Sequence, residues 1–68
     1  MIPVESSAII AVDYDPGAGV LTVQFTGMAI YEYADVPKIV FQELMAAESK
    51  GTYFALYIRD EYEYRRVR

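Results

Sequence analysis

Val20-Leu21-Thr22-Val23-Gln24-Phe25 is the stretch that decides the fold class. Its apolar residues alternate with polar ones, so Leu21, Val23 and Phe25 point to the same face of an extended strand. A period of two with one apolar face indicates a half-buried β-strand, and the neighbouring segments show what pairs with it and what covers it.

Two further strands are predicted on either side of it. Residues 8–14 are rich in β-branched side chains and stop at Asp15-Pro16-Gly17-Ala18-Gly19, whose composition is typical of a turn. Thr26-Gly27 supplies the positive φ that a tight hairpin needs, and residues 29–33 then return as a third strand. The first half of the chain is therefore predicted to form an antiparallel meander.

Two helices are predicted next. Pro37 suits the first helical position and Asp35 favours the positive helix end, so we expect a helix from there through about Ala47. Its apolar face consists of Val40, Phe41, Leu44 and Met45. Ser49 is a good N-cap for a second, shorter helix. The apolar face of that helix consists of Tyr53, Phe54, Tyr57 and Ile58.

The alternation in residues 61–67 predicts a last strand, with Tyr62, Tyr64 and Arg66 on one side. We expect this strand to pair with residues 8–14, which would place that first strand inside the sheet. The predicted order is β-β-β-α-α-β. The fold class is α+β, with residues 1–68 forming one small domain in which two helices cover one face of a four-stranded antiparallel sheet.

Composition excludes several functional classes. The chain has no Cys and no His, so we expect no disulfide, no ordinary metal site and no cofactor, and no serine has a histidine base for catalysis. We therefore expect a protein that is not an enzyme. The uncharged stretch 16–31 contains glycines and alternates as strands do, and the N-terminus lacks a secretory pattern, so we expect no membrane association and a cytoplasmic location.

Charge is distributed unevenly along the chain. The net charge is −4, yet residues 1–37 contain no base and all six Lys and Arg lie in residues 38–68. A basic patch around Arg59 and Arg65-Arg66-Val67-Arg68 is compatible with an acidic protein, and a solvated tail is the simpler interpretation.

Two Tyr-Glu-Tyr triplets, at residues 31–33 and 62–64, each place two tyrosines side by side on one strand face. Exposed, such pairs stack bases at about 1 to 3 kcal/mol per base. Buried, they fill a small core, and we favour packing for at least one pair because a chain this short needs the buried area. Glu32 and Glu63 would then face outward.

Ser49-Lys50-Gly51-Thr52 lies at a predicted helix N-terminus, where free N–H groups, hydroxyls and a lysine suit a phosphate. Arg59 would be the second ligand of such an anion. The upstream glycine of a P-loop is absent, so an NTPase is rejected, and an ordinary capped helix remains the favoured alternative.

An ordered set of short motifs carries a family resemblance across nearly the whole chain. It comprises Ser6-Ser7, Tyr14-Asp15, Leu21-x-Val23-x-Phe25, Tyr31-x-Tyr33, Val36-Pro37, Ser49-Lys50-Gly51-x-Tyr53-Phe54, Ile58-Arg59 and Tyr62-x-Tyr64. In this order the motifs resemble the KTSC domain, which is named for its occurrence at the C-terminus of some lysyl-tRNA synthetases and also occurs as a stand-alone protein. The resemblance suggests RNA binding, while Ala55, in place of an expected asparagine, and the acidic net charge depart from the pattern.

Two functional hypotheses follow. The first is a non-enzymatic module that binds RNA or another phosphate-bearing ligand. Its stacking candidates are Tyr31, Tyr33, Tyr62 and Tyr64, and its phosphate contacts are Lys50, Arg59 and Arg65. The second is a protein-interaction module or homo-oligomer, because 54% of the residues are hydrophobic in a chain too small to bury them all.

Overall fold

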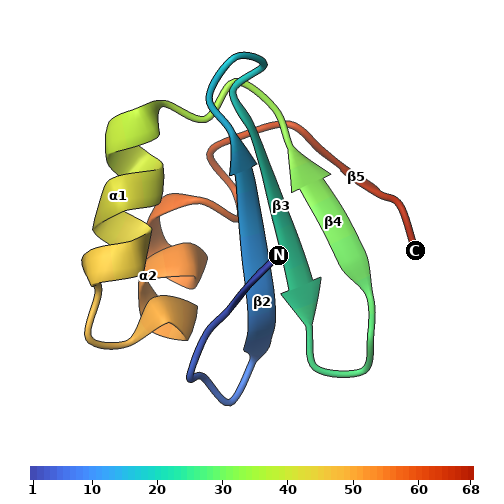
Figure 1. Ribbon diagram of the computed structural model, residues 1–68, viewed down its shortest axis with the longest axis vertical. Coiled ribbons are helices and arrows are strands. Elements are labelled where there is room, and N and C mark those ends of the chain that lie inside the picture. The colour runs from blue at the N-terminus through green and yellow to red at the C-terminus, as the bar shows by residue number, and fades with distance from the viewer.

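The computed structural model describes residues 1–68 and shows an antiparallel sheet with both helices on one of its faces (Figure 1). The strands are β1 (Ile2–Pro3), β2 (Ile9–Asp15), β3 (Val20–Phe25), β4 (Ile30–Tyr33) and β5 (Tyr64–Arg66). The helices are α1 (Lys38–Ala46) and α2 (Lys50–Tyr57). The predicted α+β class is confirmed, and neither helix has the length and apolar character needed to cross a membrane.

The strand order is β1-β2-β3-β4-β5, which places β3 at the centre. The predicted pairing of the last strand with residues 8–14 is wrong, because β5 pairs with β4 and Tyr64 lies opposite Tyr33. The edge of β2 that β5 was expected to occupy is taken by β1, whose Ile2 lies opposite Val12. This fifth strand was not predicted, since two residues are too few to show an alternating pattern.

The turns contain three residues with positive φ that matter here. Gly19 ends the β2–β3 turn at φ +69°, and Gly27 supplies φ +94° in the β3–β4 hairpin, as predicted. The residue after it, Met28, also has positive φ, at +74°. A non-glycine side chain is strained in this region, so the hairpin stores a small amount of backbone strain.

Pro37 precedes α1 rather than starting it, because its ψ of 148° is extended, and the first helical residue is Lys38. Leu44 is the buried residue of this helix, and Phe41 stacks on Tyr14 of β2 with ring centroids 4.8 Å apart. The Tyr14 hydroxyl donates a hydrogen bond of 2.6 Å to the carbonyl oxygen of Val36. This bond ties β2 to the segment that leads into α1.

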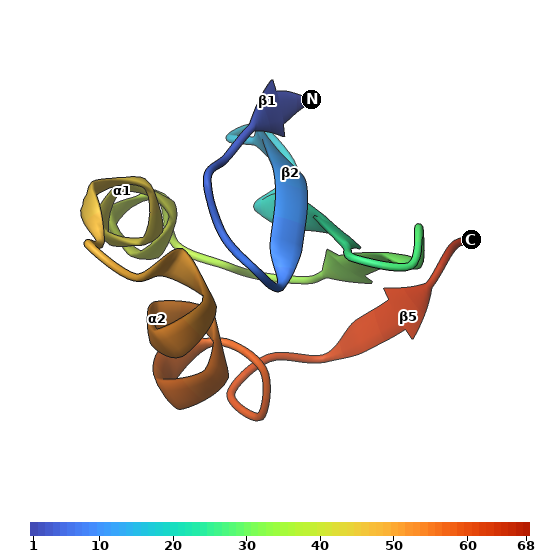
Figure 2. The ribbon, with the colours of Figure 1, turned by 90° about the horizontal axis from the view of Figure 1, so that it is seen from below.

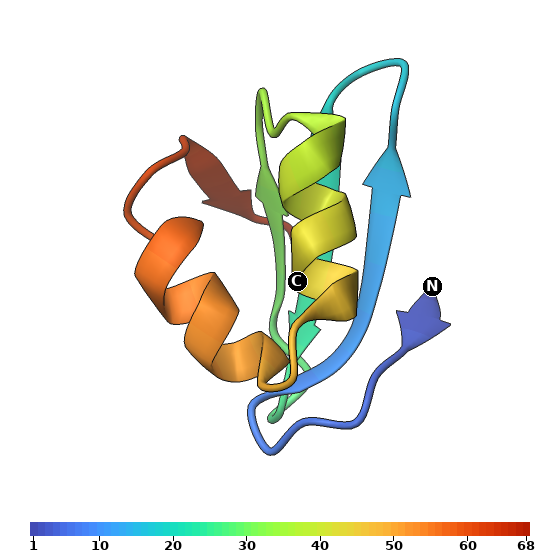
Figure 3. The ribbon, with the colours of Figure 1, turned by 90° about the vertical axis from the view of Figure 1, so that its left-hand side faces the viewer.

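Ser49 caps α2 as predicted, accepting a hydrogen bond from the Thr52 N–H at 3.3 Å. Figure 3 shows that α2 is inclined to α1 and lies toward the β5 side of the sheet. Phe54 and Ile58 are buried, as predicted. Tyr57 was predicted to lie on the same apolar face, but it is 56% exposed and does not face the core. A helix at the border of the sheet buries only a narrow stripe.

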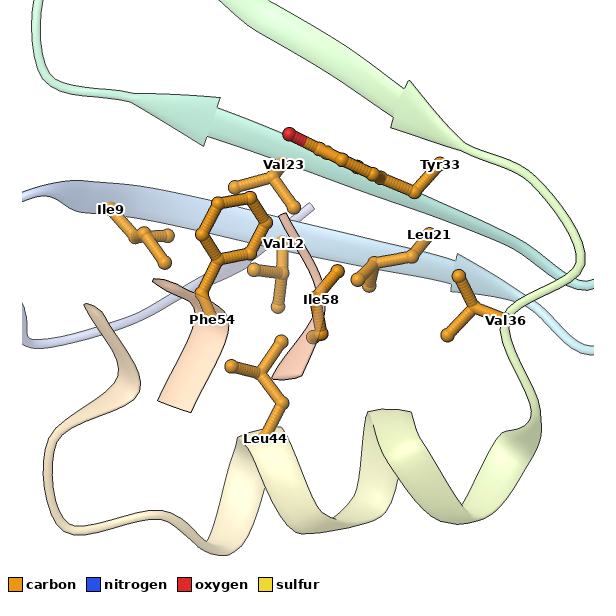
Figure 4. Close-up of a cluster of buried hydrophobic side chains, with 9 residues drawn as sticks. All are labelled: Ile9, Val12, Leu21, Val23, Tyr33, Val36, Leu44, Phe54 and Ile58. Carbon is orange, nitrogen blue, oxygen red and sulfur yellow. The ribbon is translucent and has the colours of Figure 1, made fainter. Parts of the chain in front are cut away.

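The core is a cluster of nine side chains contributed by three strands, both helix regions and the loop before α1 (Figure 4). These are Ile9, Val12, Leu21, Val23, Tyr33, Val36, Leu44, Phe54 and Ile58. Tyr33 is the one tyrosine among them, and Tyr31 packs against the cluster, so the expectation that at least one tyrosine pair packs is confirmed.

Candidate functional site

An open groove of about 580 Å³ lies between α2 and the β4–β5 side of the sheet. Figure 2 shows that α2 and β5 are well separated in this view. We call it the aromatic groove, because its lining includes Phe25, Tyr31, Tyr33, Phe54 and Tyr64. Arg59 is the one charged residue that lines it.

Strand register explains why the tyrosines meet. Tyr31 and Tyr33 lie opposite Val23 and Leu21 of β3, so both point to the face that the helices cover. Tyr64 lies opposite Tyr33 and therefore shares that face. The strand β5 is exposed along its length, and Tyr64 is consequently 59% exposed.

The aromatic rings form a packed base, and Tyr64 is the most exposed residue among them. Phe54 meets Tyr33 edge-on, with ring centroids 5.3 Å apart and an interplanar angle of 81°. Tyr64 is tilted over Tyr31 and Tyr33 at centroid distances of 5.6 and 5.5 Å. Since Tyr33 is buried and Tyr64 is not, a planar ligand in this groove would meet the Tyr64 ring.

Two polar groups define the electrostatics of the groove. Burial raises the pKa of Tyr33 to about 12, with Tyr64 and Tyr31 adding to the shift and Arg59 opposing it. The Tyr33 hydroxyl is therefore protonated at neutral pH. The Arg59 guanidinium lies 3.8 Å from the Asp60 carboxylate, and both side chains are exposed, so this ion pair is weak and leaves Arg59 available to an anion.

The aromatic groove brings together four of the seven predicted site residues, namely Tyr31, Tyr33, Arg59 and Tyr64. Lys50 lies outside it, in a polar depression beside Ser6 and Glu48, and its Nζ donates to the Ala47 carbonyl at 3.1 Å. In the structure the Ser49-Lys50-Gly51-Thr52 stretch is the capped start of α2.

Tyr62 and Arg65 also lie away from the groove. The last strand begins at Tyr64, not at residue 61, so Tyr62 belongs to the preceding loop and does not share a strand face with Tyr64. Arg65 points to the opposite face of the sheet, where its Nε donates to Glu32 Oε1 at 2.9 Å. Strand alternation makes this necessary once Tyr64 faces the groove.

Arg66, not Arg65, shares the face of Tyr64, because it lies opposite Tyr31 in the strand pairing. The i, i+2 spacing from Tyr64 to Arg66 is the sequence signal that places these two residues on one face. Phe25 and Phe54 were also missed as lining residues, since the sequence shows them only as core candidates.

Comparisons with known proteins agree on one family. Residues 5–62 match the family model of the KTSC domain. A protein from Tsukamurella paurometabola is 55% identical over 53 residues, which cover 78% of this chain and 79% of that protein. A lysine–tRNA ligase from Nostoc sp. is 41% identical over 63 residues, which are 93% of this chain and 11% of the ligase.

A solved structure agrees with both the fold and this family. The crystal structure of a KTSC domain protein from Yersinia pestis superposes with a TM-score of 0.94 at 36% identity, covering 97% of this chain and 93% of that one. The agreement extends over the sheet and both helices, beyond the residues that the family model matches.

Proposed function

This chain belongs to the KTSC domain family, and from that membership and the aromatic groove we propose that it is a non-enzymatic module that binds single-stranded RNA. In this proposal one unstacked base lies on Tyr64 in the groove, and Arg59 contacts an adjacent phosphate. The observation that carries the proposal is the meeting of Tyr31, Tyr33, Tyr64 and Arg59 in one open groove.

Stacking favours a base as the occupant. The Tyr64 ring is 59% exposed and is held in place by contacts with Tyr31 and Tyr33, so little side-chain freedom is lost when a base packs on it. A base that stacks on one aromatic side chain gains about 1 to 3 kcal/mol, which is sequence-tolerant because every base has a flat face.

Local charge also favours a polyanion at this end of an acidic protein. Arg59 lines the groove, and Arg66 and Arg68 follow Tyr64 along and beyond β5. On the opposite sheet face Glu32 is paired with Arg65, whereas Asp60, Glu61 and Glu63 line an adjoining depression with Tyr64. The arginines at this end therefore offset part of the net charge of −4 where an RNA would bind.

The relatives supply independent support. A lysine–tRNA ligase from Nostoc sp. contains a segment similar to 93% of this chain, and the name of that protein refers to tRNA. This similarity supports RNA as the proposed ligand and the cytoplasm as the proposed location. The ligase activity itself is not part of the proposal, because this chain corresponds to 11% of that protein.

A protein segment is the alternative occupant, since nine of the eleven lining residues are hydrophobic. The two occupants differ in their response to salt. Phosphate contacts release counterions, so RNA binding should weaken steeply as salt is added, whereas insertion of an apolar peptide should not.

The test is an NMR titration of the isotope-labelled protein with short single-stranded RNA at low and moderate salt. We expect Tyr64→Ala to weaken binding about 5- to 150-fold, and Arg59→Ala to weaken it and lower the salt slope by about one. Tyr57→Ala and Arg65→Ala are matched controls, because Tyr57 is equally exposed and Arg65 faces the other side of the sheet.

Binding that is absent at low salt would overturn the proposal. So would an Arg65→Ala effect equal to that of Arg59→Ala, because this would show attraction to charge in general rather than to the groove. A groove that binds an apolar peptide without salt dependence, and no RNA, would establish the protein-interaction alternative.

A further inference from the structure

Another depression, of about 370 Å³, lies between α1, α2 and the loop that precedes β5. Its lining consists of Val40, Glu43, Tyr53, Tyr57, Glu61 and Tyr62. We call it the acidic tyrosine pocket. It shares no residue with the aromatic groove, because Tyr53 and Tyr57 project from a different face of α2 than Phe54 and Ala55.

Aromatic rings make up half of this lining. The rings of Tyr53 and Tyr57 are 4.8 Å apart with an interplanar angle of 44°, so together they form two adjoining walls. Tyr62 is half-buried and lines the same space from the loop. Tyr57 is 56% exposed, so its ring is accessible from solvent.

The charge of the lining is uniformly negative. Glu43 of α1 and Glu61 of the loop are its charged members, and no Lys or Arg lines the pocket. The field of these acids reaches the rings, since the pKa of Tyr53 is raised first by burial and then by Glu43. Lys50 does not line this pocket, and its Nζ donates to the Ala47 carbonyl.

We propose that the acidic tyrosine pocket binds the cationic head of an Arg or Lys side chain presented by a segment of a partner protein. The tyrosine faces attract the cation through their π-electrons, and Glu43 and Glu61 are its counter-ions. Charge complementarity selects this occupant: an anion or a nucleic acid would be repelled by both carboxylates.

This site is independent of the RNA proposal, because the two sites have opposite chemistry on different faces of α2. The aromatic groove contains an arginine and no acid, whereas the acidic tyrosine pocket contains two acids and no base. A module with both sites would bind a polyanion and a basic protein segment at once.

The experiment is an NMR titration with a blocked tripeptide, acetyl-Gly-Arg-Gly-amide, observing the ring signals of Tyr53, Tyr57 and Tyr62. The neutral control peptide replaces Arg by Gln. We expect saturable shifts with about millimolar affinity for the Arg peptide, as suits one side chain, and none for the Gln peptide.

Two exposed acids form a matched pair of variants. Glu61→Gln should weaken the Arg peptide about 3- to 30-fold, because Glu61 lines the pocket. Glu63→Gln removes the same charge outside the pocket and should change the affinity less than twofold. Tyr57→Ala should weaken the Arg peptide about 2- to 30-fold without changing RNA binding.

Three results would overturn the proposal: equal binding of the Gln peptide, equal effects of Glu61→Gln and Glu63→Gln, and no shift at millimolar peptide. If dilution of the free protein alone moved the ring signals of the pocket, the occupant would be a segment of a second copy of this chain, and the separate partner protein would be ruled out. Backbone spectra of each variant verify that it is folded.

Discussion

Replacing Met28 by asparagine is expected to stabilise the protein, although most substitutions destabilise. Met28 lies in the hairpin between β3 and β4 with φ +74°. A left-handed backbone costs a residue with a Cβ atom about 1 kcal/mol, and asparagine tolerates it better because its short polar side chain bonds to the local backbone.

Little is lost in the exchange. The Met28 side chain is 57% exposed, so it contributes little buried apolar area. Its sulfur accepts a long contact of 3.5 Å from Gln24 Nε2, and a thioether is a weak acceptor. The expected net gain is about 0.5 to 1 kcal/mol, which corresponds to a rise in Tm of roughly 3 to 6 °C for a domain of this length.

The assay is urea unfolding followed by circular dichroism, with calorimetry for the Tm. Ile39→Asn is the matched control, because Ile39 is 59% exposed and lies within α1. It should leave the free energy of unfolding unchanged or lower it by a few tenths of a kcal/mol.

A neutral or destabilising Met28→Asn with an unchanged m value would refute the argument, because the hairpin would then carry no strain. An equal increase in the free energy of unfolding in Ile39→Asn would also refute the argument. The increase would then come from removing an exposed apolar side chain and not from relief of the positive φ at Met28.

Two further predictions concern tyrosine hydroxyls. Tyr14→Phe keeps the ring stacked on Phe41 but removes the 2.6 Å hydrogen bond to the Val36 carbonyl, so the free energy of unfolding in urea should fall by about 1 kcal/mol. The control Tyr57→Phe, at an exposed position, should show no loss. Equal stability of Tyr14→Phe and the wild type would mean that water replaces this bond at no cost. Because burial raises the pKa of Tyr33 from 10.0 to about 12, the stability that depends on its neutral hydroxyl is fully present below pH 10 and is lost as the pH rises to about 12. An ultraviolet absorbance titration should show this late transition in the wild type and not in Tyr33→Phe; ionisation of every tyrosine near pH 10 would contradict it.

Local signals predicted most of the fold. The alternation in residues 20–25 and the Ser49 cap depend on neighbours in sequence, and both the strand β3 and the capped start of α2 lie where they were predicted. The pairing of β5 with β4 depends on how the chain returns after α2, which no local pattern contains. The two-residue β1 is too short to show a pattern at all.

In the candidate site, too, the features set by local sequence could be predicted and those set by long-range packing could not. The i, i+2 rule placed Tyr31 and Tyr33 on one face, because it needs only the strand itself. Which tyrosine is accessible depends on where the helices end over the sheet, and Tyr64 is accessible because β5 lies beyond them. Strand alternation alone places Arg65 on the face opposite to Tyr64, so this position could be predicted from the sequence. The position of Tyr62 could not, because the strand begins at Tyr64 rather than at residue 61.

The two outermost strands have a consequence for association between copies of the sheet. Free edge strands expose unpaired N–H and C=O groups that can template further strands, which is a route to aggregation. Here β1 has two residues, one of them a proline without an N–H, and β5 has three residues, two of them arginines. Short length, proline and like charge are the features that discourage growth at an edge. Arg65 and Arg66 thus protect the sheet against polymerisation, and replacing both would expose the protein to it whether or not any ligand binds there.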